Sequence, residues 1–511
     1  MSTLLAALSQ LAPDPGYSTP RIDWHGLAPE IVLSAGGALL VLLDAIKLER
    51  AKAWMPALAN LTLLGTLIPI LTLAVEGSTR SLFGGSFVVD PMSLLLKAMF
   101  LVVGYVVILL STNYVAEGDY WESEYYTLLT TSILGMVVMA SARDLLMIFV
   151  ALELLSIPAY MLAAWRKGGR TSNEAGMKYY LMGVFASAIL LYGMSLMYGV
   201  GRSTRLDVIA ENLARPEMQS GVPIVTLAMV FIVVGFAFKV SAVPFHQWAP
   251  DTYEGAPTPV TAFLAVASKA AGFVALIQVV FYGFYVRPDI IEPLFFVLAV
   301  ASMTVGNLIA LRQTNVVRML AYSGIAQAGF MLAPFVVVGD NFDSALSAIV
   351  IYLVIYAAMN LGAFAVIIAI ARKTRSAEIT SLGGLFSYMP GMTVAMTIFL
   401  ASLTGIPPLG GWYAKFSVWS ALLGAETALG VAMAIVMAVN TVIAAYYYLN
   451  IAKTMWFDDA PDGDVAPVKV PVGLTGAVGI ALVATLVFGV LPGLLTDISN
   501  FGPVSAALGG G

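Results

Sequence analysis

The sequence predicts an all-α polytopic membrane protein, and three observations lead to this fold class. The 511 residues are 60% hydrophobic and only 11% charged, which exceeds the apolar content that a soluble core needs. Runs with almost no charge recur along the chain, at about the 20-residue length that a helix needs to cross a bilayer. Proline and glycine interrupt two of these runs. Residues 1–511 are therefore expected to form a single integral membrane domain, with no soluble domain.

Fourteen apolar runs qualify as spans, and we predict a helix for each. The first run follows the segment Met1–Ala12, which has no basic region, so no cleaved signal is expected and the first span would direct insertion. The predicted spans are about 27–46, 54–75, 91–112, 125–141, 145–165, 177–199, 222–248, 257–283, 290–311, 319–338, 344–371, 390–424, 427–452 and 470–491.

Lysines and arginines in the connections set the expected orientation. The connections that follow odd-numbered spans carry thirteen of these residues, and the opposite side carries seven. Because cytoplasmic loops are enriched in Lys and Arg, the first side is predicted to be cytoplasmic, with both termini on the extracytoplasmic side. The acidic stretch 458–464 would then be a solvated cytoplasmic loop.

The twelfth span is too long to be one straight helix. From Pro390 to Gly424 the only charge is Lys415, yet a helix of that length would measure ~50 Å against a hydrocarbon core of about 30 Å. The interruption falls in Gly405-Ile-Pro-Pro-Leu-Gly-Gly411, where two prolines remove backbone donors and three glycines free the chain. A broken helix is expected here.

A milder break, Ser241-Ala-Val-Pro244, interrupts the seventh span just after Lys239. Broken helices at membrane depth are tolerated where the freed backbone lines a buried or watery cavity, and pairs of them in matching positions indicate inverted repeats. The two breaks are five spans apart, an odd number, so a second copy would be upside down. We predict inverted five-helix repeats over 125–283 (spans 4–8) and 290–452 (spans 9–13).

Four charged residues are embedded in long apolar stretches of these spans: Glu153, Lys239, Lys269 and Lys415. Each central charge costs roughly 2.5–3.5 kcal/mol or more in a membrane helix, so such residues usually serve ion or proton chemistry. Glu153 could instead be a structural hydrogen-bonding acid, and Lys415 could reach an interface along its stem. The pattern favours an ion or proton conductor.

Other polar residues in the spans keep ordinary alternatives open. Lys178 begins span six with Glu174 one turn before it, so a surface ion pair competes with a proton-transfer role. His246 follows the helix break and could relay protons or bond a freed carbonyl. Lys97 and Asp44 are expected nearer an interface, as anchors.

Composition excludes several classes of function. The chain has no cysteine and only two histidines, so it offers no ligands for an iron–sulfur cluster or thiolate metal site, and we predict no cofactor or metal of its own. No basic face exists outside short loops, so nucleic acid is not an expected partner. If electrons are involved, they travel elsewhere.

Several strings resemble a known family, over nearly the whole chain. The strings Leu152-Glu-Leu-Leu-Ser-Ile-Pro-Ala-Tyr-Met-Leu162, Lys178-Tyr-Tyr-Leu-Met-Gly-Val-Phe-Ala-Ser-Ala188, Ala267-Ser-Lys269 and Phe238-Lys-Val-Ser-Ala-Val-Pro-Phe-His-Gln-Trp-Ala-Pro-Asp-Thr-Tyr-Glu-Gly-Ala-Pro257 are similar to the antiporter-like membrane subunits of bacterial NADH:quinone oxidoreductase, respiratory complex I. The Pro-Phe-His string belongs to the wider superfamily. The Leu-Glu-Leu-Leu-Ser-Ile-Pro string resembles subunit N.

The resemblance implies a proton-translocating, non-redox subunit of a translocase in the bacterial plasma membrane. NADH, FMN, iron–sulfur clusters and quinone would be held by partner subunits. The expected partners are neighbouring antiporter-like and small membrane subunits, the peripheral redox arm and the lipid bilayer.

The same resemblance implies roles for the charged residues. Glu153 and Lys239 would face each other as an ion pair that opens and closes, which changes how readily the lysine gives up its proton. Lys269 would pass the charge change on laterally, and Lys415 would release or take up the proton. The family often has a histidine in span ten where this chain has Gln327, which cannot titrate and could only orient water.

Two other functions remain open from the sequence. The chain could be a subunit of a multisubunit cation/proton antiporter, since that class shares the Pro-Phe-His string. It could also be a structural spacer between neighbouring subunits. Sodium as the transported ion is not excluded either, although no cluster of carboxylates and hydroxyls for a dry sodium site stands out.

Overall fold

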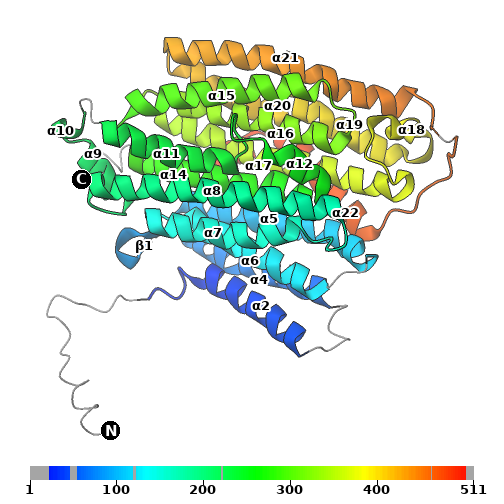
Figure 1. Cartoon of the computed structure of the whole chain (residues 1–511), viewed down its shortest axis with the longest axis horizontal. Helices are drawn as coiled ribbons and strands as arrows, with labels where there is room; N and C mark the ends of the chain where they lie inside the picture. The colour runs from blue at the N-terminus through cyan, green and yellow to red at the C-terminus, as the bar shows by residue number, and fades with distance from the viewer. Residues whose placement is uncertain (1–21, 47–53, 119–121, 220–222, 462, 502–511) are drawn as a thin grey trace, which may run out of the picture.

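The computed structural model describes residues 22–46, 54–118, 122–219, 223–461 and 463–501. Its long helices run roughly parallel to one another in a single bundle (Figure 1). The short hairpin strand β1 (Arg80–Leu82) and the helices α9 and α10 lie at one end of the bundle, and α18 lies at the other. We refer to these as the β1 end and the α18 end.

The described residues form helices joined by short connections, with a two-stranded hairpin of β1 and β2 (Phe87–Val89). The helices are α2 (Ala28–Ala45), α4 (Met55–Glu76), η1 (Phe83–Gly85), α5 (Pro91–Ala116), α6 (Glu122–Ser141), α7 (Leu145–Ala163), α8 (Arg170–Gly201), α9 (Leu206–Leu213), α10 (Pro216–Gln219), α11 (Pro223–Lys239), α12 (Trp248–Gly255), α13 (Thr258–Phe263), η2 (Leu264–Ser268), α14 (Lys269–Val279), η3 (Val280–Phe284), α15 (Pro288–Ala310), α16 (Val316–Leu332), η4 (Ala333–Val337), α17 (Phe342–Thr374), η5 (Ile379–Leu382), α18 (Leu385–Tyr388), α19 (Pro390–Thr404), α20 (Gly410–Gly424), α21 (Ala428–Phe457), α22 (Val472–Val490) and α23 (Gly493–Ile498).

The predicted fold class is confirmed. Eleven helices of the described chain are long and apolar enough to cross a membrane, and α11 and α19 are shorter apolar helices. The remaining predicted span corresponds to α6, which packs against α5 and α7. Most boundaries differ from the prediction by a few residues, because polar end residues continue a helix beyond its apolar stretch.

Both predicted breaks are present. In the seventh span, α11 ends at Lys239 and α12 begins at Trp248, so the span continues to Gly255 rather than ending near residue 248. In the twelfth span, α19 ends at Thr404 and α20 begins at Gly410. A cis peptide bond precedes Pro244 in the first break and Pro408 in the second.

The eighth span contains two π-helical segments, η2 and η3, that the sequence did not predict. This span, Thr258–Phe284, is wholly buried inside the protein, and the spans of α16 and α17 are almost as deeply buried. Segments of π-helix are common near functional sites. The segment η2 ends immediately before Lys269, so this buried lysine lies at a local change in helical geometry.

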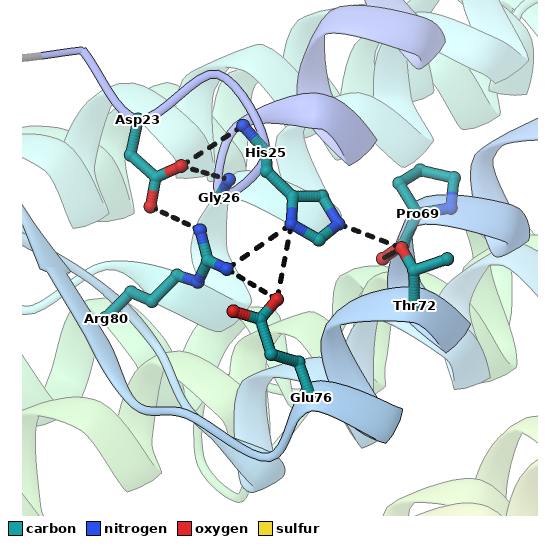
Figure 2. A network of polar contacts seen from close by, with 7 residues as sticks. All are labelled: Asp23, His25, Gly26, Pro69, Thr72, Glu76 and Arg80. Atoms are coloured by element: carbon teal, nitrogen blue, oxygen red, sulfur yellow. Dashed lines mark hydrogen bonds and ion pairs between the residues drawn. The ribbon is translucent and has the colours of Figure 1, made fainter.

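At the β1 end, a polar network connects the segment before α2 to the end of α4 (Figure 2). The Arg80 guanidinium donates hydrogen bonds to Asp23 and Glu76, each at 2.6 Å. His25 Nε2 lies 2.9 Å from the Thr72 hydroxyl, and its Nδ1 lies 3.4 Å from the Glu76 carboxylate. These contacts fasten the start of the described chain to the hairpin and to α4.

Candidate functional site

Lys239 lies at the first helix break, where α11 ends. Its side chain is only 3% exposed, and its Nζ donates to the Ser156 hydroxyl at 2.8 Å and to the Tyr179 hydroxyl at 3.1 Å. Ser156 is on α7 and Tyr179 on α8, so two neighbouring spans hold the ammonium group. The Trp248 indole of α12 stacks on Tyr179 and donates to the carbonyl of Phe238 at 3.0 Å, and this carbonyl also accepts from Ser241 N. The break thus positions the lysine between hydroxyl acceptors.

Glu153 lies half-buried in the middle of α7, and the Ser187 hydroxyl of α8 donates to it at 2.6 Å. The expected direct pair is absent: among the described residues no carboxylate oxygen lies within 4.0 Å of Lys239 Nζ. Ser156 occupies the place nearest the lysine, three positions after Glu153 and on the same side of the helix. Glu153 and Lys239 therefore each hydrogen-bond to a residue of α8, but they do not contact each other.

Lys269 continues this arrangement toward the second half of the chain. The Tyr179 hydroxyl that contacts Lys239 also lies 3.4 Å from the hydroxyl of Ser268, the neighbour of Lys269. Lys269 is 1% exposed and donates to the carbonyl of Gly324 on α16 at 2.8 Å. A Cβ atom at Gly324 would lie 3.1 Å from Lys269 Nζ, so glycine leaves this carbonyl accessible to the ammonium group.

Gln327 lies one helical turn after Gly324. Its amide donates to the carbonyl of Leu403 at 3.0 Å, and its oxygen accepts from the Tyr352 hydroxyl at 2.5 Å. Tyr448 Oη lies 3.3 Å from the same amide nitrogen and hydrogen-bonds to Ser323. The glutamine thus uses both ends of its amide, and it connects α16 to the last turn of α19.

Lys415 lies on α20, just past the second break, and is 2% exposed. Its Nζ donates to the carbonyl of Thr404 at 2.8 Å and lies 4.5 Å from the centre of the Phe330 ring. Thr404 is the last residue of α19, and the last carbonyls of a helix have no partner within it. Gly405 follows with a φ of 95°, a left-handed conformation that glycine adopts without strain.

The structure therefore brings the four predicted membrane charges and Gln327 into one polar region through the middle of the protein. We call this set the buried relay: Glu153, Lys239, Lys269, Gln327 and Lys415. The sequence reasoning missed the side chains that join these residues. Ser156, Tyr179 and Ser268 nevertheless lie within the quoted strings, and hydroxyl groups among apolar residues in a membrane span were the available signal.

Lys178 lies apart from this relay, at the α18 end of α8. Its side chain is 43% exposed and pairs with Glu174 and Asp251, each at 2.7 Å. Asp251 also accepts from Arg318 at 2.8 Å, and Arg318 pairs with Glu254. The ions connect α8, α12 and α16 at the surface, so the predicted i,i+4 pair is present within a larger cluster.

His246 lies in the turn between α11 and α12, about half-buried. Its Nδ1 is buried and makes no well-formed hydrogen bond to any described residue, whereas the residue's carbonyl accepts from Ala249 N at 3.0 Å. The imidazole interacts with the backbone of Pro244 in the first break, and it makes no direct contact with the buried relay.

Lys97, expected nearer an interface as an anchor, forms a buried ion pair. Its side chain is wholly buried on α5, with Nζ 2.7 Å from a carboxylate oxygen of Glu30 on α2 and 4.9 Å from the Phe87 ring centre. The sequence analysis did not predict that Glu30 is the partner of Lys97. Glu30 stands near the start of the first span, and acids are common at helix starts. Asp44 accepts a hydrogen bond from Ser123 between α2 and α6.

A second buried charge network lies near the β1 end. Arg143 donates to Asp90 at 2.6 Å and to the side chain of Gln278, and its guanidinium lies 3.9 Å from the Tyr282 ring centre. Asp90 also caps the first turn of α5. These contacts hold α5, α6 and α14 together. No group of three or more possible metal ligands occurs among the residues that the structure describes.

Comparison with protein families gives one clear result. Residues 142–443 match the model of the family described as NADH:quinone oxidoreductase/Mrp antiporter, TM. NADH-quinone oxidoreductase subunit N of Brevibacillus brevis is 39% identical over 490 residues, covering 93% of this chain and 94% of that protein. The subunit N of Heliobacterium modesticaldum is 41% identical, covering 86% of this chain and 90% of that one.

Solved structures of related membrane subunits have the same fold as this chain. A chain of respiratory complex I from Thermus thermophilus superimposes with a TM-score of 0.74 at 30% identity, covering 92% of this chain and 98% of that chain. A chain of the Mrp complex from Dietzia superimposes with a TM-score of 0.83 at 21% identity, covering 95% and 98%. The second likeness, at low identity, bears on the fold alone.

Proposed function

The chain belongs to the family of antiporter-like membrane subunits of NADH:quinone oxidoreductase, and on that premise we propose that the buried relay is its path for protons. It is a proton-translocating membrane subunit of that enzyme complex. The chain covers 94% and 90% of the two relatives named subunit N, which favours this function over the antiporter alternative, with which the chain shares a fold.

One observation carries the proposed path. Three deeply buried lysines on α11, α14 and α20 each donate to an oxygen atom, and those oxygen atoms lie on α7, α16 and α19. Charged groups inside a membrane protein normally mark ion or proton pathways. A purely structural spacer would not need three such lysines, because apolar residues would fill the same volume at lower cost.

In the proposed mechanism Lys239 exchanges a proton with its hydroxyl partners. Tyr179 contacts both Lys239 and Ser268, so reorientation of this single hydroxyl would carry the change toward Lys269. Gln327 would orient the groups between Lys269 and Lys415 without titrating. Glu153 lies beyond direct contact, so it would approach Lys239 only after movement of a side chain.

His246 and Lys178 remain predictions with weaker support. His246 lies at the first break beside the Pro244 backbone, and we propose that it takes part once water enters. Lys178 is partly exposed and paired with two acids, an arrangement that also occurs at ordinary protein surfaces. We propose that it positions α8 against α12 at the mouth of the path.

The two halves of the relay fit the proposed inverted repeats. In the first half α6 packs on α7, and α8 packs on both parts of the broken span, α11 and α12. In the second half α15 packs on α16, and α17 packs on α19 and α20. Corresponding helices thus make corresponding contacts in 125–283 and 290–452.

Redox cofactors and the driving reaction would belong to partner subunits.

Replacing Glu153 by Gln tests the proposed path. The amide keeps the volume and can still accept from Ser187, but it carries no charge. We expect the assembled complex in liposomes to lose most of its proton pumping and coupled quinone reduction, while subunit content stays normal. Asp340→Asn, an exposed acid at the β1 end, is the matched control. Full pumping by an assembled Glu153→Gln complex would refute the assigned role.

Cysteine labelling tests the proposed orientation, because the native chain has no cysteine. A cysteine at Gly168, in the α7–α8 connection, should be shielded from an impermeant thiol reagent in intact cells. A cysteine at Ser203, at the opposite end of α8, should react. Gly168 labelling from outside would reverse the orientation and with it the direction of the path.

A further inference from the structure

Helices α5, α17 and α22 enclose a groove that the proton path does not use. Each of the three helices contacts the other two. Two cavities lie along this groove, one beside the α18 end and one nearer the middle of the helices. They differ sharply in the chemistry of their walls.

The inner cavity, about 250 Å³, is lined almost wholly by apolar side chains. Its walls include Val102 of α5, Leu361 of α17 and Phe488 of α22. Val102 is 45% exposed at the protein surface, so the cavity opens sideways from the bundle. An open apolar recess of this kind suits a hydrocarbon chain.

The outer cavity, about 510 Å³, is apolar on its inner side and basic at its rim. The rim carries Arg166, Arg372, Arg375 and Glu117. Arg372 and Glu117 neutralise each other through two hydrogen bonds of 2.7 and 2.8 Å. Arg166 and Arg375 form no ion pair with any described residue, so the rim keeps two uncompensated positive charges.

Arg166 is also held in place at the rim. Its guanidinium lies 5.3 Å from the centre of the Tyr114 ring, which lines the same cavity. A guanidinium that stacks on an aromatic ring keeps its donors free for a phosphate group. The hydroxyl of Tyr114 is buried and has no hydrogen-bond partner among the described residues. The rim therefore offers both charge and an unused polar atom.

The rise along α5 from the inner cavity to the basic rim is similar to the depth of one leaflet. From Val102 to Tyr114, α5 rises about 18 Å at 1.5 Å per residue, against about 15 Å for half of a hydrocarbon core. The basic rim lies at the end of the helices, where headgroups are found, and the apolar cavity lies toward the bilayer midplane.

We propose that this groove binds one anionic phospholipid, with its phosphate between Arg166 and Arg375 and an acyl chain along α5, α17 and α22. The lipid would support α17 from the face opposite the one that presents Tyr352 to Gln327. This proposal does not depend on the direction or chemistry of the proton path.

The test uses the intact complex in nanodiscs of phosphatidylcholine into which phosphatidylglycerol is titrated. Native mass spectrometry and the thermal unfolding temperature of the complex report binding. Removing both charges with Arg166→Gln and Arg375→Gln should weaken phosphatidylglycerol binding about 30-fold, which corresponds to about 2 kcal/mol at roughly 1 kcal/mol per basic residue. Proton pumping in liposomes rich in phosphatidylcholine should remain.

The matched control removes two unpaired charges at the same end of the protein, with Arg312→Gln and Lys453→Gln, which lie outside both cavities. It should retain phosphatidylglycerol binding. Equal binding by both double variants would overturn the proposed site. Equal stabilisation by inorganic phosphate alone would reject the lipid and leave an anion site.

A photoreactive residue at Leu110, in the inner wall of the outer cavity, provides a second measurement that does not require removing the arginines. In the wild-type complex it should crosslink to phospholipid. Crosslinking to a neighbouring protein subunit instead would overturn the proposal and assign the groove to a protein contact.

Discussion

The two helix breaks each contain a cis proline, but their lysines have different hydrogen-bond acceptors. At the first break, the carbonyl of Phe238 accepts from Trp248 and from Ser241 N, and Lys239 donates to hydroxyl groups. At the second break, Lys415 itself satisfies the freed carbonyl of Thr404. A hydroxyl can both donate and accept, whereas a carbonyl only accepts. Lys239 therefore has partners that can also donate, whereas Lys415 completes the hydrogen bonding of a helix end.

The largest difference between the two breaks should appear when each lysine is replaced by alanine. Lys239→Ala and Lys415→Ala should each lower proton pumping by about a hundredfold or more, the usual contribution of a proton-transfer group. Only Lys415→Ala should also destabilise the protein, by about 1–3 kcal/mol, because it leaves a buried carbonyl without a partner. Pumping in liposomes and thermal unfolding of the complex measure the two effects. Equal stability of both variants would contradict the structural role of Lys415.

Arginine at each position separates fixed charge from titration. Because a guanidinium hardly loses its proton, Lys239→Arg and Lys415→Arg should restore stability but only part of the pumping. Wild-type pumping with Lys239→Arg would rule out a titrating lysine there and leave a fixed countercharge.

Tyr179→Phe should have the next largest effect, and only on the first break. The ring would remain stacked on Trp248, but Lys239 would lose one hydrogen-bond acceptor. The contact between the Tyr179 hydroxyl and Ser268 would also be lost. Hydrogen bonds to charged groups contribute about 1.5–3 kcal/mol, so we expect turnover to fall by about tenfold or more. Quinone reduction coupled to pumping measures this. Tyr180→Phe, on the neighbouring exposed position, is the control.

Gln327→Leu should have a smaller effect, on the second break. Leucine removes the donor to the Leu403 carbonyl and the acceptor for Tyr352, two hydrogen bonds between neutral groups. These contribute about 0.5–1 kcal/mol each, so we expect a loss of roughly 5- to 30-fold in turnover. Gln327→His should retain most activity, since imidazole can donate with one nitrogen and accept with the other. Identical activity for all three side chains would remove Gln327 from the relay.

The smallest effect concerns the network at the β1 end, distant from both breaks. The pKa of Asp23 is lowered from its ordinary value, first by the backbone N–H of Gly26 and then by Arg80. A lowered pKa adds stability above the unfolded value of about 3.9, and this stability is lost as pH falls through the folded pKa. Because the pair is partly exposed to solvent, Asp23→Asn should cost at most about 1 kcal/mol at pH 7.

Thermal unfolding of the complex at pH 7 and below pH 4 checks this. The difference between wild type and Asp23→Asn should disappear at the lower pH, and Asp340→Asn should show no such difference at either pH. Persistence of the difference at low pH would show that the carboxylate charge is not its source.

The sequence by itself determined the fold class, the two breaks and the four membrane charges. Apolar length sets the number of spans, proline removes backbone donors wherever it stands, and a charge in an apolar span is costly in any arrangement. These are local properties of the chain, and the helices α11, α12, α19 and α20 confirm them.

Only the tertiary structure decided which groups touch. It separated Glu153 from Lys239 by placing Ser156 nearest the lysine, and it buried Lys97 against Glu30 although both stand near helix starts in the sequence. Such contacts depend on how helices far apart in the chain pack against one another, and helical spacing along one span carries no information about the neighbouring span.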